Sequence, residues 1–219
     1  MTADAYRQII DTFFGHSPYA DFDARGGSAT PQGWGQHNPV FEKLIREVRP
    51  RLIVEVGSWL GASAIRMANL LAEEDIEGTI VCVDTWLGSA IHWREETYRR
   101  QLDLKNGYPR LYQAFLANVV AAGRQETILP MPQTGENAAR MIGSLGLSAE
   151  LIYIDGDHEG TAVYADLMNY WPLLSPGGVM FGDDFVAEWP GVVQAVKLFA
   201  NKVGLQPELM GEKWILRKP

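Results

Sequence analysis

The sequence predicts an α/β fold in which helices cover both faces of a doubly wound, mostly parallel sheet. Three observations predict this class. Five β-branched, apolar runs alternate with helix-like segments along the chain. The runs are continuously apolar rather than alternating, which is typical of parallel strands that are buried on both faces. Two further short runs at the end of the chain lie too close together for a crossover helix, so they favour an antiparallel hairpin at one sheet edge.

Each expected strand is followed by an expected helix. The strands are expected at residues 51–57, 79–84, 126–131, 150–155 and 178–183. The helices are expected at residues 61–71, 108–122, 136–142, 164–174 and 192–202. The closing hairpin is expected to pair residues 206–209 with residues 213–217. The charged insertion at residues 88–107 has two interpretations, a solvated helix or a lid over a ligand.

The first 50 residues differ from the rest in composition. Residues 4–14 have apolar side chains at helical spacing, and Asn38 followed by Pro39 is typical of the start of a second helix. Between these helices, residues 15–36 are rich in glycine, proline, serine and aromatic residues. We therefore expect an N-terminal helical cap and lid at residues 1–50 and a ligand-binding domain at residues 51–219.

Composition excludes several classes of protein. The 219 residues include 19 basic and 27 acidic side chains, so the net charge of −8 argues against nucleic-acid binding. The single cysteine, Cys82, excludes an intrachain disulfide and a cysteine-based zinc site. Neither a membrane-spanning apolar run nor a secretion signal is visible in the sequence. We therefore expect a cytoplasmic protein without membrane or nucleic-acid partners.

Acidic residues end four of the five expected strands. They are Glu55, Asp84, Asp155 and Asp183. Ligands of open parallel sheets bind at the carboxyl ends of the strands, so these residues predict the position of a site. Carboxylates crowded at one sheet edge repel one another, so something positive is expected among them.

The loop after the first strand carries two glycines four residues apart, Gly57 and Gly61. They allow the backbone to approach a ligand and to start a helix. The dinucleotide fingerprint is absent, because Trp59 stands where its second glycine would be, and the phosphate-binding lysine of P-loops is absent too. The loop therefore favours a ligand without a diphosphate.

Residues 55–61 resemble the first motif of class I S-adenosylmethionine-dependent methyltransferases, and Asp84 is similar to that family's ribose-binding acid. The resemblance covers residues 51–219 and implies a Rossmann-like methyltransferase domain there. It implies cofactor binding by Glu55, Gly57, Ser58 and Ser63 near the methionine end, by Asp84, Thr85 and Trp86 at the ribose, by Gln133 and Thr134 near the adenine, and also by Gly61 and Asp155. The alternatives from the residues themselves are that Asp84 caps a turn and that Trp86 packs in the core.

A second constellation joins Asp155 to the adjacent pair Asp183 and Asp184. Three carboxylates from two neighbouring strand ends are typical of a hard-oxygen site for Mg²⁺, Mn²⁺ or Ca²⁺, although Asp157 could replace any one of them. The constellation resembles metal-dependent small-molecule O-methyltransferases of the branch that includes macrolide-sugar methyltransferases and cephalosporin-hydroxylase-like proteins. In sugar-modifying members, a histidine at the spacing of His158 is the base. Solvated loop carboxylates and a surface or metal-binding histidine are the alternatives.

The function that this resemblance implies is transfer of a methyl group from S-adenosylmethionine to a hydroxyl of a small molecule. A divalent cation would lower the pKa of the hydroxyl, and His158 would take its proton. Two alternatives stay open: a nicotinamide-dependent oxidoreductase, and a cofactor-binding module that needs a partner protein. Aromatic residues of the cap would also suit a homodimer contact.

Overall fold

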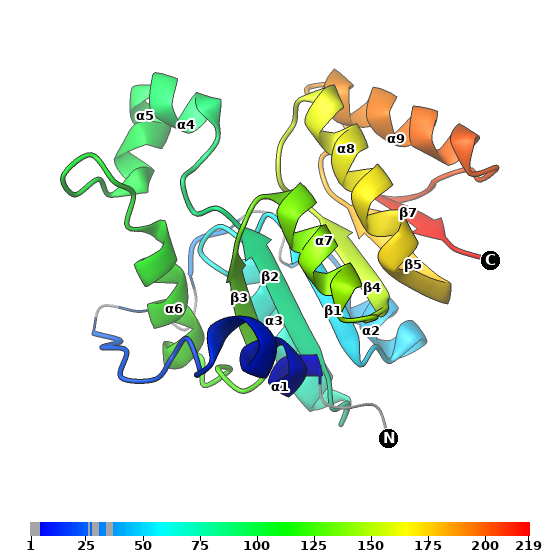
Figure 1. The fold of residues 1–219 in the computed structure, drawn as a ribbon. Coiled ribbons are helices and arrows are strands. Elements are labelled where there is room, and N and C mark those ends of the chain that lie inside the picture. The colour runs from blue at the N-terminus through cyan, green and yellow to red at the C-terminus, as the bar shows by residue number, and fades with distance from the viewer. Residues whose placement is uncertain (1–4, 26, 28–30, 34–36) are drawn as a thin grey trace.

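A computed structural model describes residues 5–25, 27, 31–33 and 37–219. Its centre is a seven-stranded sheet in the order β3-β2-β1-β4-β5-β7-β6 (Figure 1). The strands are β1 (Leu52–Val56), β2 (Thr79–Asp84), β3 (Ile128–Pro132), β4 (Ala149–Ile154), β5 (Leu174–Gly182), β6 (Glu208–Met210) and β7 (Lys213–Arg217). The pairs among β1 to β5 are parallel, whereas β7 runs antiparallel to both β5 and β6. The predicted fold class and its closing hairpin are confirmed.

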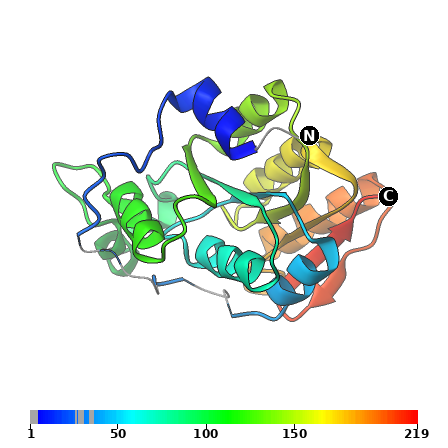
Figure 2. The same ribbon diagram turned by 90° about the horizontal axis from the view of Figure 1, so that it is seen from below.

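Helices occupy both faces of this sheet. They are α1 (Ala5–Ile9), continued by the π-helical turn η1 (Ile10–Phe14), α2 (Val40–Val48), α3 (Ala62–Glu73), α4 (Ala90–Arg94), α5 (Glu96–Arg99), the 3₁₀ turn η2 (Arg100–Leu102), α6 (Leu111–Ala121), α7 (Gly135–Ser144), α8 (Gly160–Tyr170), the 3₁₀ turn η3 (Trp171–Leu173) and α9 (Pro190–Lys202). One core lies under α1, α7, α8 and α9, and the other lies under α2, α3 and α6. The view from below shows α1 and α7 on one side of the sheet and α2 and α3 on the other (Figure 2).

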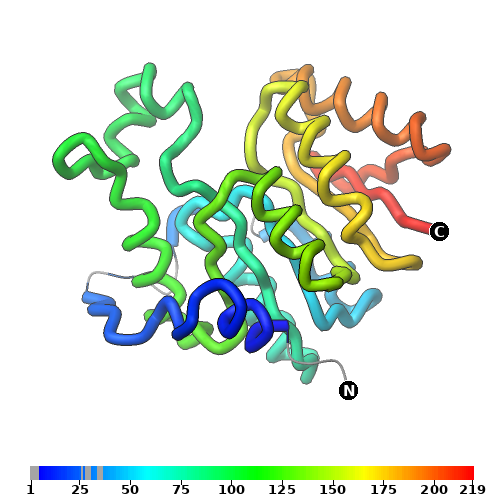
Figure 3. Tube along the Cα trace, in the orientation of Figure 1, coloured from blue at the N-terminus to red at the C-terminus, as the bar shows by residue number. Residues whose placement is uncertain are grey.

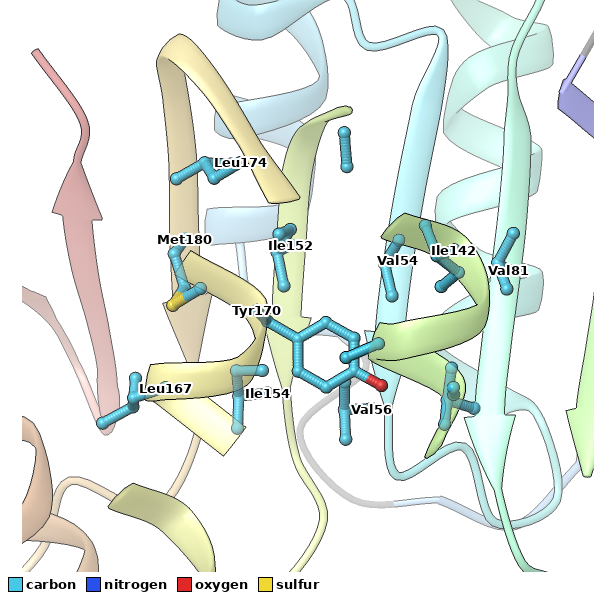
Figure 4. Packing of buried hydrophobic residues seen from close by; sticks show 14 of the residues in the cluster. Val54, Val56, Val81, Ile142, Ile152, Ile154, Leu167, Tyr170, Leu174 and Met180 are labelled. Atoms are coloured by element: carbon cyan, nitrogen blue, oxygen red, sulfur yellow. The ribbon is translucent and has the colours of Figure 1, made fainter. Parts of the chain in front are cut away.

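The alternation of side chains along β1 and β4 separates the two cores. Val54 and Ile152 point to the face that α7 and α8 cover, where the ring of Tyr170 lies over the sheet (Figure 4). Ile53 and Leu151 point to the opposite core. Because both faces of these strands are buried, the sequence of each is continuously apolar.

The described helices of the first 50 residues share these two cores. On α1, Tyr6 and Ile9 are buried, and the Tyr6 hydroxyl donates to the Gln125 carbonyl oxygen at 2.6 Å. On α2, Phe41 and Leu44 are buried in the other core. After η1 the chain passes beside the lower end of α6 (Figure 3). The domain division at residue 50 stays a prediction, and its residues 1–4, 26, 28–30 and 34–36 lie outside the described part of the chain.

The order of the strands creates a switch point between β1 and β4. From β1 the chain continues to β2 and β3 on one side, and it returns to β4 and β5 on the other side. At such a point the loops diverge, so a crevice opens at the carboxyl ends of the strands. The insertion after β2 folds into α4, α5 and η2, which stand beyond the carboxyl ends of β2 and β3 (Figure 1).

No helix of the described residues is both long enough and apolar enough to cross a membrane.

Candidate active site

A cleft of about 660 Å³ lies at this switch point. Most of the residues that the sequence predicts as site residues line it: Gly57, Ser58, Ser63, Asp84, Thr85, Gln133, Thr134, Asp155, His158, Asp183 and Asp184. Glu55, Gly61 and Trp86 are not among the lining residues. The ends of strands β1 to β5 therefore bring most of the predicted residues together, and the other three lie behind the wall of the cleft.

Gly57 stands where the loops after β1 and β4 touch. Its φ angle is +86°, and a Cβ atom built on it would lie 2.1 Å from the Asp155 carbonyl oxygen. The Gly57 N–H donates to the Val83 carbonyl at 2.8 Å, and the Asp155 N–H donates to the Val56 carbonyl at 2.8 Å. The backbone of the first loop is thus fixed against both neighbouring strands, and only glycine fits there.

Glu55 holds this loop from below. Its side chain is fully buried, and it accepts hydrogen bonds from the Ser58 hydroxyl at 2.7 Å and from the Ser63 hydroxyl. Burial raises the pKa of the Glu55 carboxyl, and the two serine hydroxyls oppose that shift. Glu55 therefore positions two serines that line the cleft, and it does not itself line the cleft.

Asp84 binds the same loop from the side of β2. Its carboxylate accepts the N–H of Ser58 at 3.0 Å, of Trp59 at 2.9 Å and of Trp86 at 2.8 Å. Burial raises the pKa of Asp84, and these backbone N–H groups oppose the shift. The turn-capping alternative describes these contacts. Asp84 also lines the cleft, so it could reach a ligand there. Its binding of a ribose stays a prediction.

Trp86 belongs to the core, as the alternative interpretation has it. It is 2% exposed, and its ring lies 4.8 Å from that of Phe115. Its indole N–H donates to the Trp59 carbonyl at 2.7 Å. Both Trp59 (φ +47°) and Trp86 (φ +52°) have left-handed backbone conformations. Such strain at two bulky residues is characteristic of loops whose shape matters for function.

The insertion after β2 docks on the first loop through His92. The His92 ring lies 4.6 Å from the Trp59 ring, and Tyr98 packs edge-on against His92 at 5.7 Å. His92 also completes a capping box with Ser89 at the start of α4. Burial lowers the pKa of His92. Because Ser89, Ile91, His92 and Tyr98 line the cleft, the lid interpretation of the insertion gains support.

His158 faces the cleft from the loop after β4. Its Nε2 lies 2.9 Å from Asp184 Oδ2, and its ring stacks on Trp189 at 4.1 Å. The hydrogen bond to Asp184 raises the pKa of His158, with burial opposing. Asp184 has φ +61°, a strained backbone that directs its carboxylate at the histidine. A histidine held and oriented by a carboxylate is the arrangement of a general base.

The predicted metal ligands meet a buried lysine instead. Lys213 of β7 has no exposed surface, and its Nζ forms an ion pair with Asp183 Oδ2. The second Asp183 oxygen accepts the Asp184 N–H at 2.9 Å. Asp155 Oδ2 accepts the Tyr153 hydroxyl at 2.8 Å. Burial raises the pKa of Asp155 well above its usual range; Asp183 adds to the shift, and Lys213 opposes it.

The residues as arranged do not fit a divalent cation. Such an ion needs carboxylates that are free to face it, whereas here Asp183 is paired with the Lys213 ammonium and Asp184 with the His158 ring. No three His, Cys, Asp or Glu side chains within the described ranges could share a metal ion. The metal site predicted at Asp155, Asp183 and Asp184 is therefore not shown by this arrangement, and it stays a prediction from the sequence. The positive group expected among the carboxylates is present, but it is an ammonium.

Asp166 is a cleft residue that sequence reasoning missed. It projects from α8, with one carboxylate oxygen next to Gly135. Burial, with a contribution from Asp157, raises its pKa to about 7. A signal existed in the sequence: Asp166 falls on the apolar stripe of Val163, Leu167 and Tyr170, where an acidic side chain is unexpected.

Comparison with known families matches residues 54–185 to the model "Methyltransferase domain". The chain belongs to this methyltransferase domain family. The match spans the first loop, the insertion after β2 and the His158–Asp184 pair, so most of the residues that line the cleft lie inside the matched region. A curated relative, the uncharacterized protein y4gI of Sinorhizobium fredii, is 30% identical over 158 residues. That alignment covers 71% of this chain but only 15% of y4gI.

Solved structures agree with this assignment at the level of the fold. An O-methyltransferase from Bacillus cereus in complex with SAH matches with a TM-score of 0.59 and 16% identity over 97% of this chain and 94% of that chain. TomG from Streptomyces achromogenes, solved with SAM, matches with a TM-score of 0.59 and 14% identity over 99% of this chain and 96% of that chain. The calicheamicin methyltransferase CalS11 matches with a TM-score of 0.58 and 21% identity over 81% of this chain and 77% of that chain. The fold is the class I methyltransferase fold.

Proposed function

We propose that this chain transfers a methyl group from S-adenosylmethionine to a hydroxyl oxygen of a small molecule, with His158 as the base. One observation carries the proposal: the glycine loop after β1 and the His158–Asp184 pair line the same cleft. Membership of the methyltransferase domain family supports the reaction type, and structures of this fold with SAH and SAM support the cofactor.

The cleft suits S-adenosylmethionine in its shape and charge. Gly57 keeps one wall free of a side chain, and the serines held by Glu55 present hydroxyls beside it. When bound, the cofactor supplies an electrophilic methyl group on a cationic sulfur and leaves as a neutral thioether. Acidic side chains that line the cleft, Asp157 and Glu212 among them, favour a cationic ligand over a neutral one. We also propose that Gln133 and Thr134 contact the adenine of the cofactor.

His158 takes the proton of the acceptor hydroxyl. Asp184 holds Nε2–H, so the other ring nitrogen, Nδ1, is the atom that receives the proton as the oxygen attacks the methyl carbon. Asp184 then stabilises the imidazolium that forms. Stacking on Trp189 fixes the plane of the ring. Divalent-metal assistance forms no step of this mechanism, because the carboxylates predicted to hold the ion are engaged otherwise.

The acidic lining of the cleft limits the kinds of acceptor molecule that we propose. Among the described residues, the cleft is lined by seven carboxylates and by no lysine or arginine: Asp84, Asp155, Asp157, Asp166, Asp183, Asp184 and Glu212. The residues outside the described ranges contain no lysine or arginine either. A phosphate or carboxylate on the acceptor would meet like charge, so the proposed acceptor is a neutral or cationic alcohol or phenol. A structure of the same fold is named as a TDP-rhamnose 3'-O-methyltransferase, and its named substrate carries phosphates. The acceptor proposed for this chain differs from that substrate in its charge.

Calorimetric titration with S-adenosylmethionine tests the cofactor, and absence of binding would refute it. Methyl transfer is then measured by mass spectrometry with paired acceptors, tyramine and 4-hydroxyphenylacetate, which differ mainly in the charge of the side arm. We expect the cationic member to be preferred. A His158→Asn variant should keep cofactor binding and lose turnover by about 10²-fold or more. Cofactor binding without turnover of any acceptor would favour the module that needs a partner protein.

A further inference from the structure

Lys213 is buried beneath the acidic ends of two parallel strands. It is the first residue of β7, which lies between β5 and β6, and its side chain has no exposed surface. Its Nζ lies 5.2 Å from the centre of the Phe41 ring and 5.0 Å from that of Tyr153. A buried ammonium is retained in a fold only where anionic and polar partners compensate its loss of hydration.

Those partners connect Lys213 to two of the three carboxylates that the sequence assigns to a metal, Asp183 and Asp155. Nζ donates directly to Asp183 Oδ2, and it donates to the Tyr153 hydroxyl at 2.8 Å. The Tyr153 hydroxyl in turn donates to Asp155 Oδ2 at 2.8 Å. One ammonium is therefore bonded to the end of β5 directly and to the end of β4 through a single hydroxyl.

We infer that the Lys213 ammonium takes the place of a divalent cation in this cleft, so that the chain holds its acidic strand ends together without a bound metal. A divalent ion shared by Asp155 and Asp183 would lie beside an ammonium that already contacts Asp183, and the two cations would repel each other. The Phe41 and Tyr153 rings pack beside the Lys213 ammonium and favour its present position.

Lys213 is a positioning residue in this account. It fixes Asp183, whose other oxygen accepts the Asp184 N–H at 2.9 Å, and Asp184 holds His158. The chain of contacts thus runs from β7 to the base. The activity arm of the inference rests on the proposed function, whereas the metal-binding arm does not.

Electron paramagnetic resonance of Mn²⁺ tests the metal-binding arm on the intact protein. After dialysis against EDTA, the wild-type protein should bind less than 0.1 equivalent of Mn²⁺ at about 50 µM, and its calorimetric affinity for S-adenosylmethionine should change less than twofold on dialysis. Stoichiometric binding of Mn²⁺ by the wild-type protein would overturn the inference, even if S-adenosylmethionine fails to bind and the proposed function falls.

The variant Lys213→Met keeps the length of the side chain and removes its charge. We expect it to gain one Mn²⁺ site and to lose turnover at least tenfold in EDTA, with Mn²⁺ restoring part of it. Lys218→Met is the matched control, because Lys218 donates to the Trp171 and Leu174 carbonyl oxygens away from the cleft. If Lys213→Met folds but binds no more Mn²⁺ than this control, Lys213 does not stand in for a cation. If it does not fold, the wild-type measurement still decides.

Discussion

Replacing Gly57 by alanine tests the contact between the loops after β1 and β4. The added Cβ would lie 2.1 Å from the Asp155 carbonyl oxygen, inside the 3.0 Å limit that real Cβ contacts respect, so the two loops must separate by nearly an ångström. The left-handed φ of +86° adds about 1 kcal/mol of strain. Separation also weakens the bond from the Asp155 N–H to the Val56 carbonyl, which contributes about 1 kcal/mol.

Together with lost packing, these effects predict a loss of about 2–4 kcal/mol in the free energy of unfolding. For a chain of this size the melting temperature should fall by roughly 5–12 °C. Gly204→Ala is the matched control, because Gly204 has φ +72° but nothing within 4 Å of a built Cβ. It should cost only the strain, about 1 kcal/mol.

Thermal unfolding and calorimetric titration with S-adenosylmethionine measure the two effects separately. Gly57→Ala should weaken cofactor binding at least tenfold, whereas Gly204→Ala should leave it unchanged. Equal melting temperatures for the two variants would refute the close approach of the loops. Unchanged binding in Gly57→Ala would refute the role of this loop in holding the cofactor.

Other residues of the cleft give further predictions. In the profile of kcat/KM against pH, the acidic limb should lie above the ordinary histidine value of about 6.5, because Asp184 raises the pKa of His158; Asp184→Asn should move the limb to lower pH. A pH profile that Asp184→Asn leaves in place would contradict the pair. The pKa of Asp166 is raised to about 7, so the folded state binds more protons than the unfolded state between about pH 4 and 7 and loses stability as pH rises through that window. Asp166→Asn should therefore raise the melting temperature more at pH 8 than at pH 5, and equal shifts at both pH values would argue against the buried, protonated acid.

Much of the fold follows from the sequence, because parallel strands that are buried on both faces have continuously apolar sequences. Residues 79–84 and 213–217 are strands with the predicted ends, and β1, β3 and β4 begin and end within two residues of prediction, whereas β5 begins four residues earlier than predicted. An error of the same size lies at α8, expected at 164–174 but observed at Gly160–Tyr170. The Asp157 carboxylate accepts the N–H groups of His158 and Glu159 ahead of this helix, and a local cap of that kind has no hydrophobic periodicity.

The site was predictable in position but less so in the roles of its residues. Strand ends locate the cleft, since every parallel strand delivers its last residue to one edge of the sheet. Whether an acidic residue faces the ligand depends on neighbours that the local sequence does not reveal. Glu55 is turned under the loop by two serines, and Asp183 is paired with a lysine from a strand 30 residues further along the chain. That pairing depends on the register of β5 with β7, which apolar patterning alone does not fix.

The position of Lys213 also makes the assembly of the cleft depend on the final turn of the chain. A nascent polypeptide that has emerged only as far as Asp184 would carry six of the seven acidic side chains that line the cleft, without Lys213 to neutralise them. Mutual repulsion would hold those strand ends apart until the hairpin of β6 and β7 arrives. A fragment that ends before Lys213 would therefore retain the aspartates and the histidine and yet lack a working arrangement of them.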